Sequence, residues 1–187
     1  MAKTDLKDAY LAVPVKIEFH KLLRFVWKGK YYQCVAMPFG LSSAPRTFTK
    51  LMKPLVAYLR RRGIRLIIYL DDMLILNKEQ AGLIVDLELS PRMIESLGFV
   101  INYAKLVVPT KSIEYLGLIL NSKDMPLSLT KKRISEFINL CNEMSGSSET
   151  SRKILEQLLG KFSWAEAAVP FVIITLCKQC NTLKRVF

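Results

Sequence analysis

Two adjacent acids interrupt a strongly apolar stretch, and this feature constrains the fold more than any other in the sequence. Residues 66–70 and 73–76 are apolar or aromatic, and Asp71 and Asp72 separate them. Two such runs joined by turn-forming residues predict a β-hairpin with carboxylates at its tip. Because adjacent carboxylates repel each other, holding them between buried strands indicates a divalent cation, and Mg²⁺ prefers carboxylate oxygens. A solvated turn would also accommodate both acids, so the pair alone does not decide between these readings.

The rest of the chain predicts a mixture of strands and helices. Helices are expected where apolar residues recur every three or four positions, over residues 45–62, 80–97, 129–144 and 151–164. Strands are expected over residues 5–15, 100–108 and 113–120, and over two segments of residues 16–34 that meet at a turn, Lys28-Gly29-Lys30. Residues 37–45 are rich in Pro, Gly and Ser and predict a loop.

The charge of the chain is strongly positive. It has 28 Lys and Arg against 16 Asp and Glu in 187 residues, a net charge of +12. This surplus favours a polyanionic partner, nucleic acid before an anionic membrane, although an indifferent basic surface has the same composition. Two basic clusters, residues 60–65 and 131–133, are candidates for phosphate contacts, or else solvated helix ends.

Targeting and cysteine patterns favour an intracellular, cytoplasmic or nuclear protein that is not secreted. Residues 1–5 have no apolar core of a secretory signal, and the apolar run 167–177 is too short to span a membrane. The four cysteines do not form a disulfide framework. Cys177 and Cys180 make a lone CxxC, and with a single histidine they favour two cysteines on one helix face over a zinc site.

A second acidic segment, with Asp5 and Asp8, lies near the start of the chain. If the strand that carries Asp5 neighbours the hairpin, Asp5 approaches Asp71, and three carboxylates can hold two metal ions for phosphoryl chemistry. The alternative is that Asp5 and Asp8 only cap the entry of the chain.

These segments resemble, in order, the motifs of reverse transcriptases. Residues 5–10 (DLKDAY) resemble the first catalytic motif, residues 37–48 (MPFGLSSAPRTF) the second and residues 69–72 (YLDD) the third. Residues 97–110 resemble the fourth motif and residues 113–117 the primer grip. The second motif and residues 158–165 most resemble retrotransposons of the DIRS group, which pair a reverse transcriptase with a tyrosine recombinase.

The resemblance implies a role for each matching residue. Asp5, Asp71 and Asp72 would bind two Mg²⁺ ions, with Mn²⁺ as a possible substitute, and Lys105 would donate a proton to the leaving pyrophosphate. The incoming deoxynucleoside triphosphate would meet Leu6, Lys7, Asp8, Ala9, Tyr10, Phe39 and Gly40. Tyr115, Leu116 and Gly117 would steady the primer of an RNA or DNA template–primer.

The resemblance also implies an α+β fold, with an antiparallel palm sheet covered by helices on one face. We expect a palm over residues 1–127, with a short fingers insertion at about residues 14–36, and a helical thumb-like region over residues 128–187. Family members carry a sizeable fingers segment before the first motif, so an N-terminally truncated chain is expected. Two functions remain open: an RNA-directed DNA polymerase, and an inactive nucleic-acid-binding relic of one.

Overall fold

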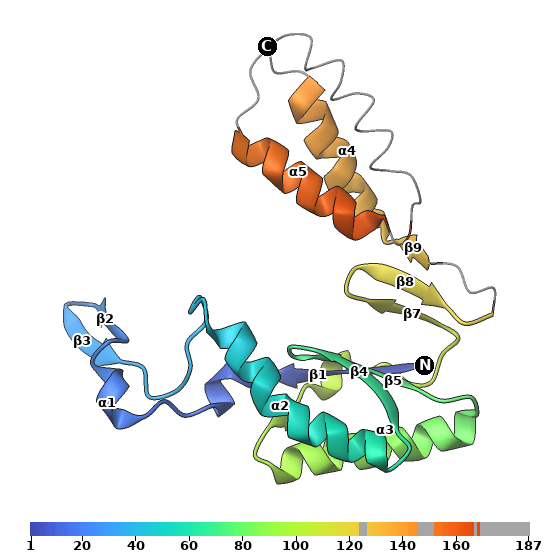
Figure 1. The fold of residues 1–187 in the computed structure, drawn as a ribbon, viewed down its shortest axis with the longest axis horizontal. Helices are drawn as coiled ribbons and strands as arrows, with labels where there is room; N and C mark the ends of the chain where they lie inside the picture. Colours follow the sequence, from blue (N-terminus) through green and yellow to red (C-terminus); the bar gives the residue numbers. More distant parts are fainter. Residues whose placement is uncertain (124–126, 146–151, 167, 169–187) are drawn as a thin grey trace. The chain divides into compact units, whose positions relative to one another are not determined.

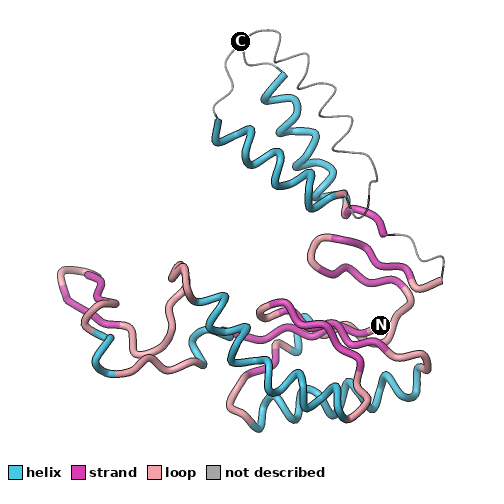
Figure 2. Tube along the Cα trace, in the orientation of Figure 1, coloured by secondary structure: helices cyan, strands magenta, loops and turns pink. Residues whose placement is uncertain are grey.

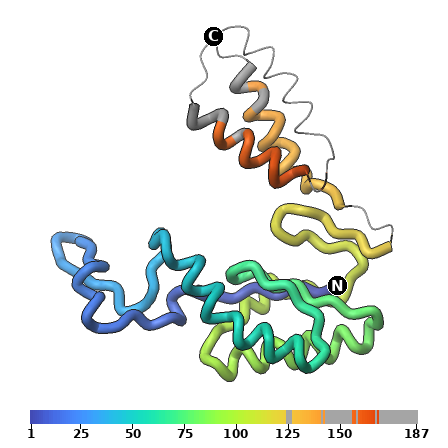
Figure 3. Tube along the Cα trace, viewed as in Figure 1, coloured from blue at the N-terminus to red at the C-terminus, as the bar shows by residue number. Residues whose placement is uncertain are grey.

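The computed structural model describes residues 1–123, 127–145, 152–166 and 168, which form two compact units. The first unit is Met1–Thr110 and the second is Lys111–Phe187. The expected boundary near Leu127 lies inside the second unit. Figure 3 follows the course of the chain through both units.

A four-stranded antiparallel sheet forms the centre of the first unit (Figure 1). Its strands are β1 (Ala2–Lys7), β4 (Arg65–Tyr69), β5 (Asp72–Leu76) and β6 (Val100–Ile101), in the order β4-β5-β1-β6. Strands β4 and β5 form the hairpin that the apolar runs predict, with Tyr69 opposite Asp72. The α+β class is therefore confirmed.

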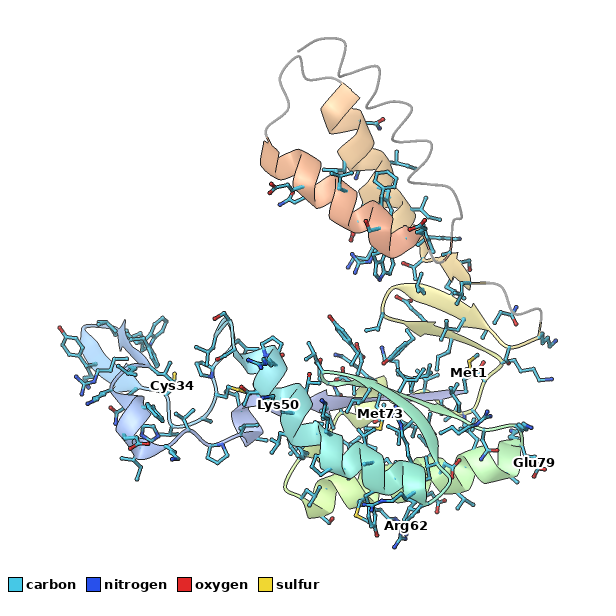
Figure 4. The ribbon with its side chains drawn as sticks, in the orientation of Figure 1. Met1, Cys34, Lys50, Arg62, Met73 and Glu79 are labelled. Atoms are coloured by element: carbon cyan, nitrogen blue, oxygen red, sulfur yellow. The ribbon has the colours of Figure 1, made fainter. Side chains whose placement is uncertain are left out.

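Helices α2 (Ala44–Arg61) and α3 (Gln80–Ser96) cover one face of this sheet. On α2, four side chains at helical spacing are buried in the core, as expected: Phe48, Met52, Leu55 and Leu59. The helix ends just before Gly63, whose φ of 86° suits glycine. Pro54 and Pro91 lie inside the two helices without ending them. Met73, labelled in Figure 4, contributes to this core from β5.

Strand register divides the sheet into a face covered by α2 and α3 and the opposite face, which these helices leave open. Side chains alternate along a strand, and Ala2, Thr4 and Leu6 of β1 are buried on the side of the helices. Lys3 and Asp5 therefore lie on the other side, and Asp5 is directly opposite Asp72. The two carboxylates predicted to share a cation are thus neighbours on the open face.

The segment between β1 and α2 holds a separate hairpin, shown in magenta in Figure 2. It contains the short helix α1 (Ile17–His20), which the sequence did not predict, and strands β2 (Arg24–Trp27) and β3 (Lys30–Gln33). Lys28 and Gly29 form the turn with φ values of 48° and 72°, so the predicted hairpin is confirmed. All eight strand residues are exposed.

The predicted strand over residues 5–15 is wrong beyond Lys7. Asp8 adopts a left-handed conformation, with φ 51° and ψ 37°, which no strand accommodates, and a 3-10 helix follows at Ala9–Ala12. Val13 and Val15 pack against the core from a segment outside the four-stranded sheet. Their alternation therefore reflects one-sided burial and not membership of that sheet.

The predicted strands over residues 100–108 and 113–120 are also partly wrong. Val100 and Ile101 pair with β1 as strand β6, a 3-10 helix follows at Tyr103–Lys105, and Val107 then forms an isolated bridge with Lys3. The second segment is a hairpin of β7 (Ser112–Tyr115) and β8 (Leu118–Asn121). Leu116 and Gly117 both have positive φ, which folds the chain back between these strands.

The second unit combines this hairpin with two helices. Strand β9 (Leu127–Leu129), which was not predicted, adds to β8, so α4 begins at Lys131 and extends to Ser145. Helix α5 spans Arg152–Ala165, as expected, and Phe162 meets Phe137 of α4 with ring centroids 5.2 Å apart. Cys177 and Cys180 lie outside the described residues, as does most of the apolar run 167–177. No described helix is long and apolar enough to cross a membrane.

Candidate active site

Two carboxylates meet across neighbouring strands on the open face of the first sheet. Asp5 of β1 pairs in register with Asp72, the first residue of β5. The backbone amide of Leu6 donates to the carbonyl of Asp71 at 2.9 Å, which fixes the hairpin turn against β1. The predicted approach of Asp5 to the acid pair is therefore present.

Asp5 is almost fully buried and is held by two side chains. Only 4% of it is exposed. The amide of Asn102 donates to Oδ1 at 3.1 Å, and the ammonium of Lys105 lies 3.2 Å from both carboxylate oxygens. A buried carboxylate needs such partners, because an unpaired one pays a large desolvation cost.

A second lysine neutralises the hairpin. The ammonium of Lys3 lies 2.9 Å from Oδ1 of Asp72, and both side chains are about four-fifths buried (19% and 25% exposed). Lys3 and Asp72 come from adjacent strands on the same face. Each of the two strand carboxylates therefore has its own ammonium partner.

Asp71 lies in the turn, where its surroundings disfavour ionisation. Partial burial of the carboxyl raises the pKa of Asp71, and the charges of Asp72 and Asp5 raise it further. Its own backbone amide and the charge of Lys105 act in the opposite direction. A bound cation would favour the ionised form of Asp71, against the effect of burial and of the two neighbouring carboxylates.

The donor chemistry of this cluster fits a divalent cation, although the carboxylates do not converge. Among the described residues, no three His, Cys, Asp or Glu side chains form a group that could hold a metal ion. The positive charge that such a cluster needs is supplied by Lys3 and Lys105. A metal would have to compete with these two ammonium groups, and its ligands would be oxygen atoms, as Mg²⁺ prefers.

An aromatic group borders the acid cluster. The ring of Tyr10 meets those of Phe39 and Phe48, each at a centroid distance of 5.4 Å. Burial, followed by the charges of Asp71 and Tyr69, raises the pKa of the Tyr10 hydroxyl. Phe39 is 64% exposed, whereas Phe48 is buried in the core. Tyr10 thus connects the core to an exposed aromatic ring beside the turn.

The other residues that the resemblance assigns to nucleotide binding have differing surroundings. Lys7 and Asp8 are exposed, and Gly40 is exposed with a φ of 85°. Leu6 and Ala9 are buried. Leu6 therefore contributes to the site by holding Asp71 through its amide, and direct contact with a nucleotide stays a prediction for all five.

The family of the chain follows from a comparison with known sequence families. The family described as "Reverse transcriptase (RNA-dependent DNA polymerase)" matches residues 1–120. The chain belongs to this family. The match includes the whole first unit and therefore every residue of the acid cluster.

Individual relatives are distant and much longer. The chain is 24% identical to the Pro-Pol polyprotein of Simian foamy virus type 1 over 166 residues, which is 89% of this chain and 13% of the polyprotein. It is 21% identical to the transposon Tf2-3 polyprotein of Schizosaccharomyces pombe, over 90% of this chain and 12% of the polyprotein. The chain thus spans about an eighth of the length of these relatives.

Solved structures share the fold. A foamy viral protease-reverse transcriptase in complex with an RNA/DNA hybrid matches 88% of this chain and 21% of its own, with a TM-score of 0.68 and 21% identity. The same viral protein, in a form designated dRH and in complex with double-stranded DNA, matches 88% of this chain and 27% of its own, with a TM-score of 0.71 and 21% identity. At this identity the likeness establishes the reverse transcriptase fold.

A basic groove lies beside the Leu70–Asp71 turn of this reverse transcriptase domain. A pocket of about 590 Å³ lies between the first turns of α2 and the end of β4, and Tyr69 and Leu70 line it. Three exposed cations of α2, at helical spacing, also line it: Arg46, Lys50 and Lys53. Lys50 is labelled in Figure 4. Residues 19–70 contain no Asp or Glu, so no nearby acid in this segment offsets these charges.

The basic cluster at residues 60–65, which the sequence singled out, has partners within the protein. Arg60 donates to the carbonyl of Leu66 at 3.0 Å, and the guanidinium of Arg62 lies 4.8 Å from the ring centroid of Tyr58. These two contacts favour a role for the cluster within the protein over contacts with phosphates. The groove on α2 is a better candidate for phosphate contacts, and the sequence offered a signal for it in the spacing of its cations.

The residues expected to form the primer grip lie in the second unit. Tyr115 is buried at the end of β7, and Leu116 and Gly117 form the tight turn before β8. Sequence reasoning assigned no role to Lys3 or Asn102, although both hold carboxylates of the acid cluster. For Lys3 a signal existed, because a lysine two residues before Asp5 on a strand must share its face.

Proposed function

We propose that this chain is the catalytic domain of a retroelement RNA-directed DNA polymerase. It would join deoxynucleoside triphosphates to a primer 3′-hydroxyl on an RNA or DNA template. The observation that carries the proposal is the pairing of Asp5 with Asp72 across β1 and β5, with Asp71 in the adjoining turn. Three carboxylates on the open face of the family's fold fit nucleotidyl transfer.

The acid cluster would hold the metal ions that this reaction requires. Asp5, Asp71 and Asp72 would bind them, as Mg²⁺ or Mn²⁺. Bound divalent ions would lower the pKa of the primer hydroxyl and offset the charge of the triphosphate. When the divalent ions bind, the ammonium groups of Lys3 and Lys105 would dissociate from Asp72 and Asp5. Lys105, freed from Asp5, would then be available to protonate the departing pyrophosphate, as the resemblance implies.

The aromatic group would select the sugar of the nucleotide. Tyr10 is fixed by Phe39 and Phe48, so its ring can act as a rigid wall against a 2′-hydroxyl. Asp8 and Ala9 would offer backbone amides to the triphosphate, and the exposed Phe39 and Gly40 would pack against nucleotide and template. Tyr115, Leu116 and Gly117 would steady the primer end.

The groove on α2 supports a template–primer as partner. Arg46, Lys50 and Lys53 can contact successive phosphates without reading bases, and such contacts make binding salt-dependent. Two structural neighbours are reverse transcriptases in complex with an RNA/DNA hybrid and with double-stranded DNA. The same class of duplex is the partner that we propose for this chain.

A second function, binding of nucleic acid without catalysis, is favoured by one specific observation. Lys3 and Lys105 already neutralise Asp72 and Asp5, and the described carboxylates do not converge on a metal position. In that case the chain would be a relic that binds template–primer but cannot extend it.

Primer extension on an RNA template separates the two functions. The polymerase should incorporate deoxynucleotides with Mg²⁺ or Mn²⁺ and lose incorporation in Asp71→Asn and Asp5→Asn variants. Glu88→Gln, which changes an exposed acid of α3, is the matched control. Salt-sensitive binding of template–primer with no extension would establish the relic instead.

We further propose that the parent element belongs to the DIRS group. The proposal rests on the amino-acid sequences of residues 37–50 and 158–165 and on no structural feature. A tyrosine recombinase encoded by the same element would support it, and a retroviral-type integrase in that place would overturn it.

A further inference from the structure

The turn expected to grip the primer packs against both helices of its own unit. Gly117 has a φ of 81°, a conformation that favours glycine. A Cβ atom at this position would lie 2.8 Å from Nε of Arg133 and 3.3 Å from Cη2 of Trp164. The first distance is too short for a real contact, so Gly117 leaves room for the arginine of α4 and the tryptophan of α5.

Arg133 has three contacts, two through its side chain and one through its backbone amide. Its guanidinium lies 5.3 Å from the ring centroid of Trp164, and its Nη1 donates to Oε2 of Glu136 at 3.0 Å. Its backbone amide donates to the hydroxyl of Thr130 at 3.4 Å. The amide of Thr130 in turn donates to the carbonyl of Gly117 at 3.4 Å. The turn, the start of α4 and the end of α5 thus share one set of contacts.

The chemistry of these contacts requires arginine. A guanidinium is planar, so it can stack on an indole and still direct an N–H group at a carboxylate. A lysine ammonium carries the same charge but offers no flat face. The pocket of about 550 Å³ between α4 and α5 is lined by Arg133, Glu136 and Trp164 among others, so these side chains are not packed from every direction. Trp164 reaches the turn directly, and Arg133 adds a second contact that holds the indole against it.

We propose that Arg133 is a positioning residue that fixes the Leu116–Gly117 turn to α5 through Trp164. The inference rests on the proposed function only in taking this turn to meet the primer. Displacement of α5 is transmitted to the turn through the stacked pair, and loss of the pair leaves the turn free to move. Arg133 itself does not touch the reacting atoms.

The test has a readout that does not depend on catalysis. The chain has two tryptophans, so Trp27→Phe leaves Trp164 as the sole fluorescent indole. In that background, Arg133→Ala and the milder Arg133→Lys should shift the Trp164 emission to longer wavelength and increase its quenching by acrylamide. Lys132→Ala, which removes a neighbouring exposed cation of α4, should change neither. Unchanged emission and quenching in both Arg133 variants would overturn the contact.

A double-mutant cycle tests the spatial part of the inference. Gly117→Ala should lower the unfolding temperature and weaken template–primer binding by roughly tenfold, because a non-glycine residue at this φ is strained and its methyl group meets Nε of Arg133. Adding Arg133→Ala should cost less in both measurements than the sum of the two single losses, because the methyl group no longer meets Nε, while the unfavourable φ of residue 117 remains. Additive losses in the double variant would overturn the proposal.

The outcomes also separate this inference from the proposed function. A chain that shows the fluorescence change and the less-than-additive loss in unfolding temperature, and that binds template–primer without extending it, retains the positioning role while the polymerase proposal fails. Equal primer extension by the original chain and by the Arg133→Ala variant would uphold the polymerase and overturn the positioning role of Arg133.

Discussion

Replacing Lys3 by methionine tests whether its ammonium group takes the place of a metal ion beside Asp72 of the β4–β5 hairpin. Two unit charges 2.9 Å apart attract by about 6 kcal/mol at an effective dielectric constant of about 20. Desolvation of both groups and the ordering of the lysine side chain offset most of this. A net loss of about 1 to 2 kcal/mol is expected without metal, which lowers the unfolding temperature of the first unit by roughly 4 to 10 °C.

Mg²⁺ should then stabilise the variant more than the original chain. Without Lys3, the carboxylate of Asp72 has lost a cation and gains more from a metal ion. The assay is thermal unfolding in chelator and in saturating Mg²⁺. Lys7→Met is the matched control, because Lys7 lies on the same face of β1 and forms no ion pair with any described residue. An equal Mg²⁺-induced shift in Lys3→Met and the original chain would refute the reasoning.

Three further predictions concern the turn, the core and the groove. The pKa of Asp71 is raised above its usual 3.8, so ionisation of this carboxyl destabilises the folded chain. This destabilisation is absent below pH 3.8 and grows as the pH rises from there through the folded pKa. Asp71→Asn should therefore unfold at a higher temperature than the original chain at pH 7, with the difference vanishing in acid; a lower unfolding temperature at pH 7 would contradict this. Phe48→Ala should cost about 3 to 5 kcal/mol in denaturant unfolding, and Phe48→Leu clearly less; equal losses would contradict the aromatic contacts. Replacing Arg46, Lys50 and Lys53 by Gln should reduce the slope of log affinity for template–primer against log salt concentration by up to about 2.7. An unchanged slope would show that these three side chains do not contact phosphates.

The sequence predicted most of the elements that build the face carrying the acid cluster. The hairpin of β4 and β5 followed from two apolar runs around two acids, and α2 from Phe48, Met52, Leu55 and Leu59 on one face. These patterns are reliable because each reports burial on one side of a regular element. The sequence predicted that Asp5 approaches Asp71 if their strands are neighbours, and the structure places Asp5 directly opposite Asp72, the next residue.

The errors arose where backbone conformation, and not side-chain pattern, determines the structure. Asp8 and Leu116 adopt positive φ although neither is glycine, so β1 ends early and residues 112–121 fold into a hairpin. The alternation of apolar residues does not predict either turn. Strand β9 escaped prediction because three residues are too few for a periodicity.

Within the site, the sequence identified the acids but not their partners. Lys3 and Asn102 bind Asp72 and Asp5 through contacts that depend on which strands are adjacent. Lys105 was expected to act on pyrophosphate, and in the structure it binds Asp5. Partners of this kind depend on strand order and register, which a single sequence specifies only weakly.

The central claim is that Asp5, Asp71 and Asp72 form one cation site, and Mn²⁺ binding measured by electron paramagnetic resonance tests it most directly. The measurement is made on the chain with template–primer and a deoxynucleoside triphosphate present. We predict bound Mn²⁺ in the original chain and in Glu88→Gln, and a large loss of bound Mn²⁺ in Asp5→Asn, Asp71→Asn and Asp72→Asn. Equal Mn²⁺ binding in the original chain and all three Asn variants would contradict the claim.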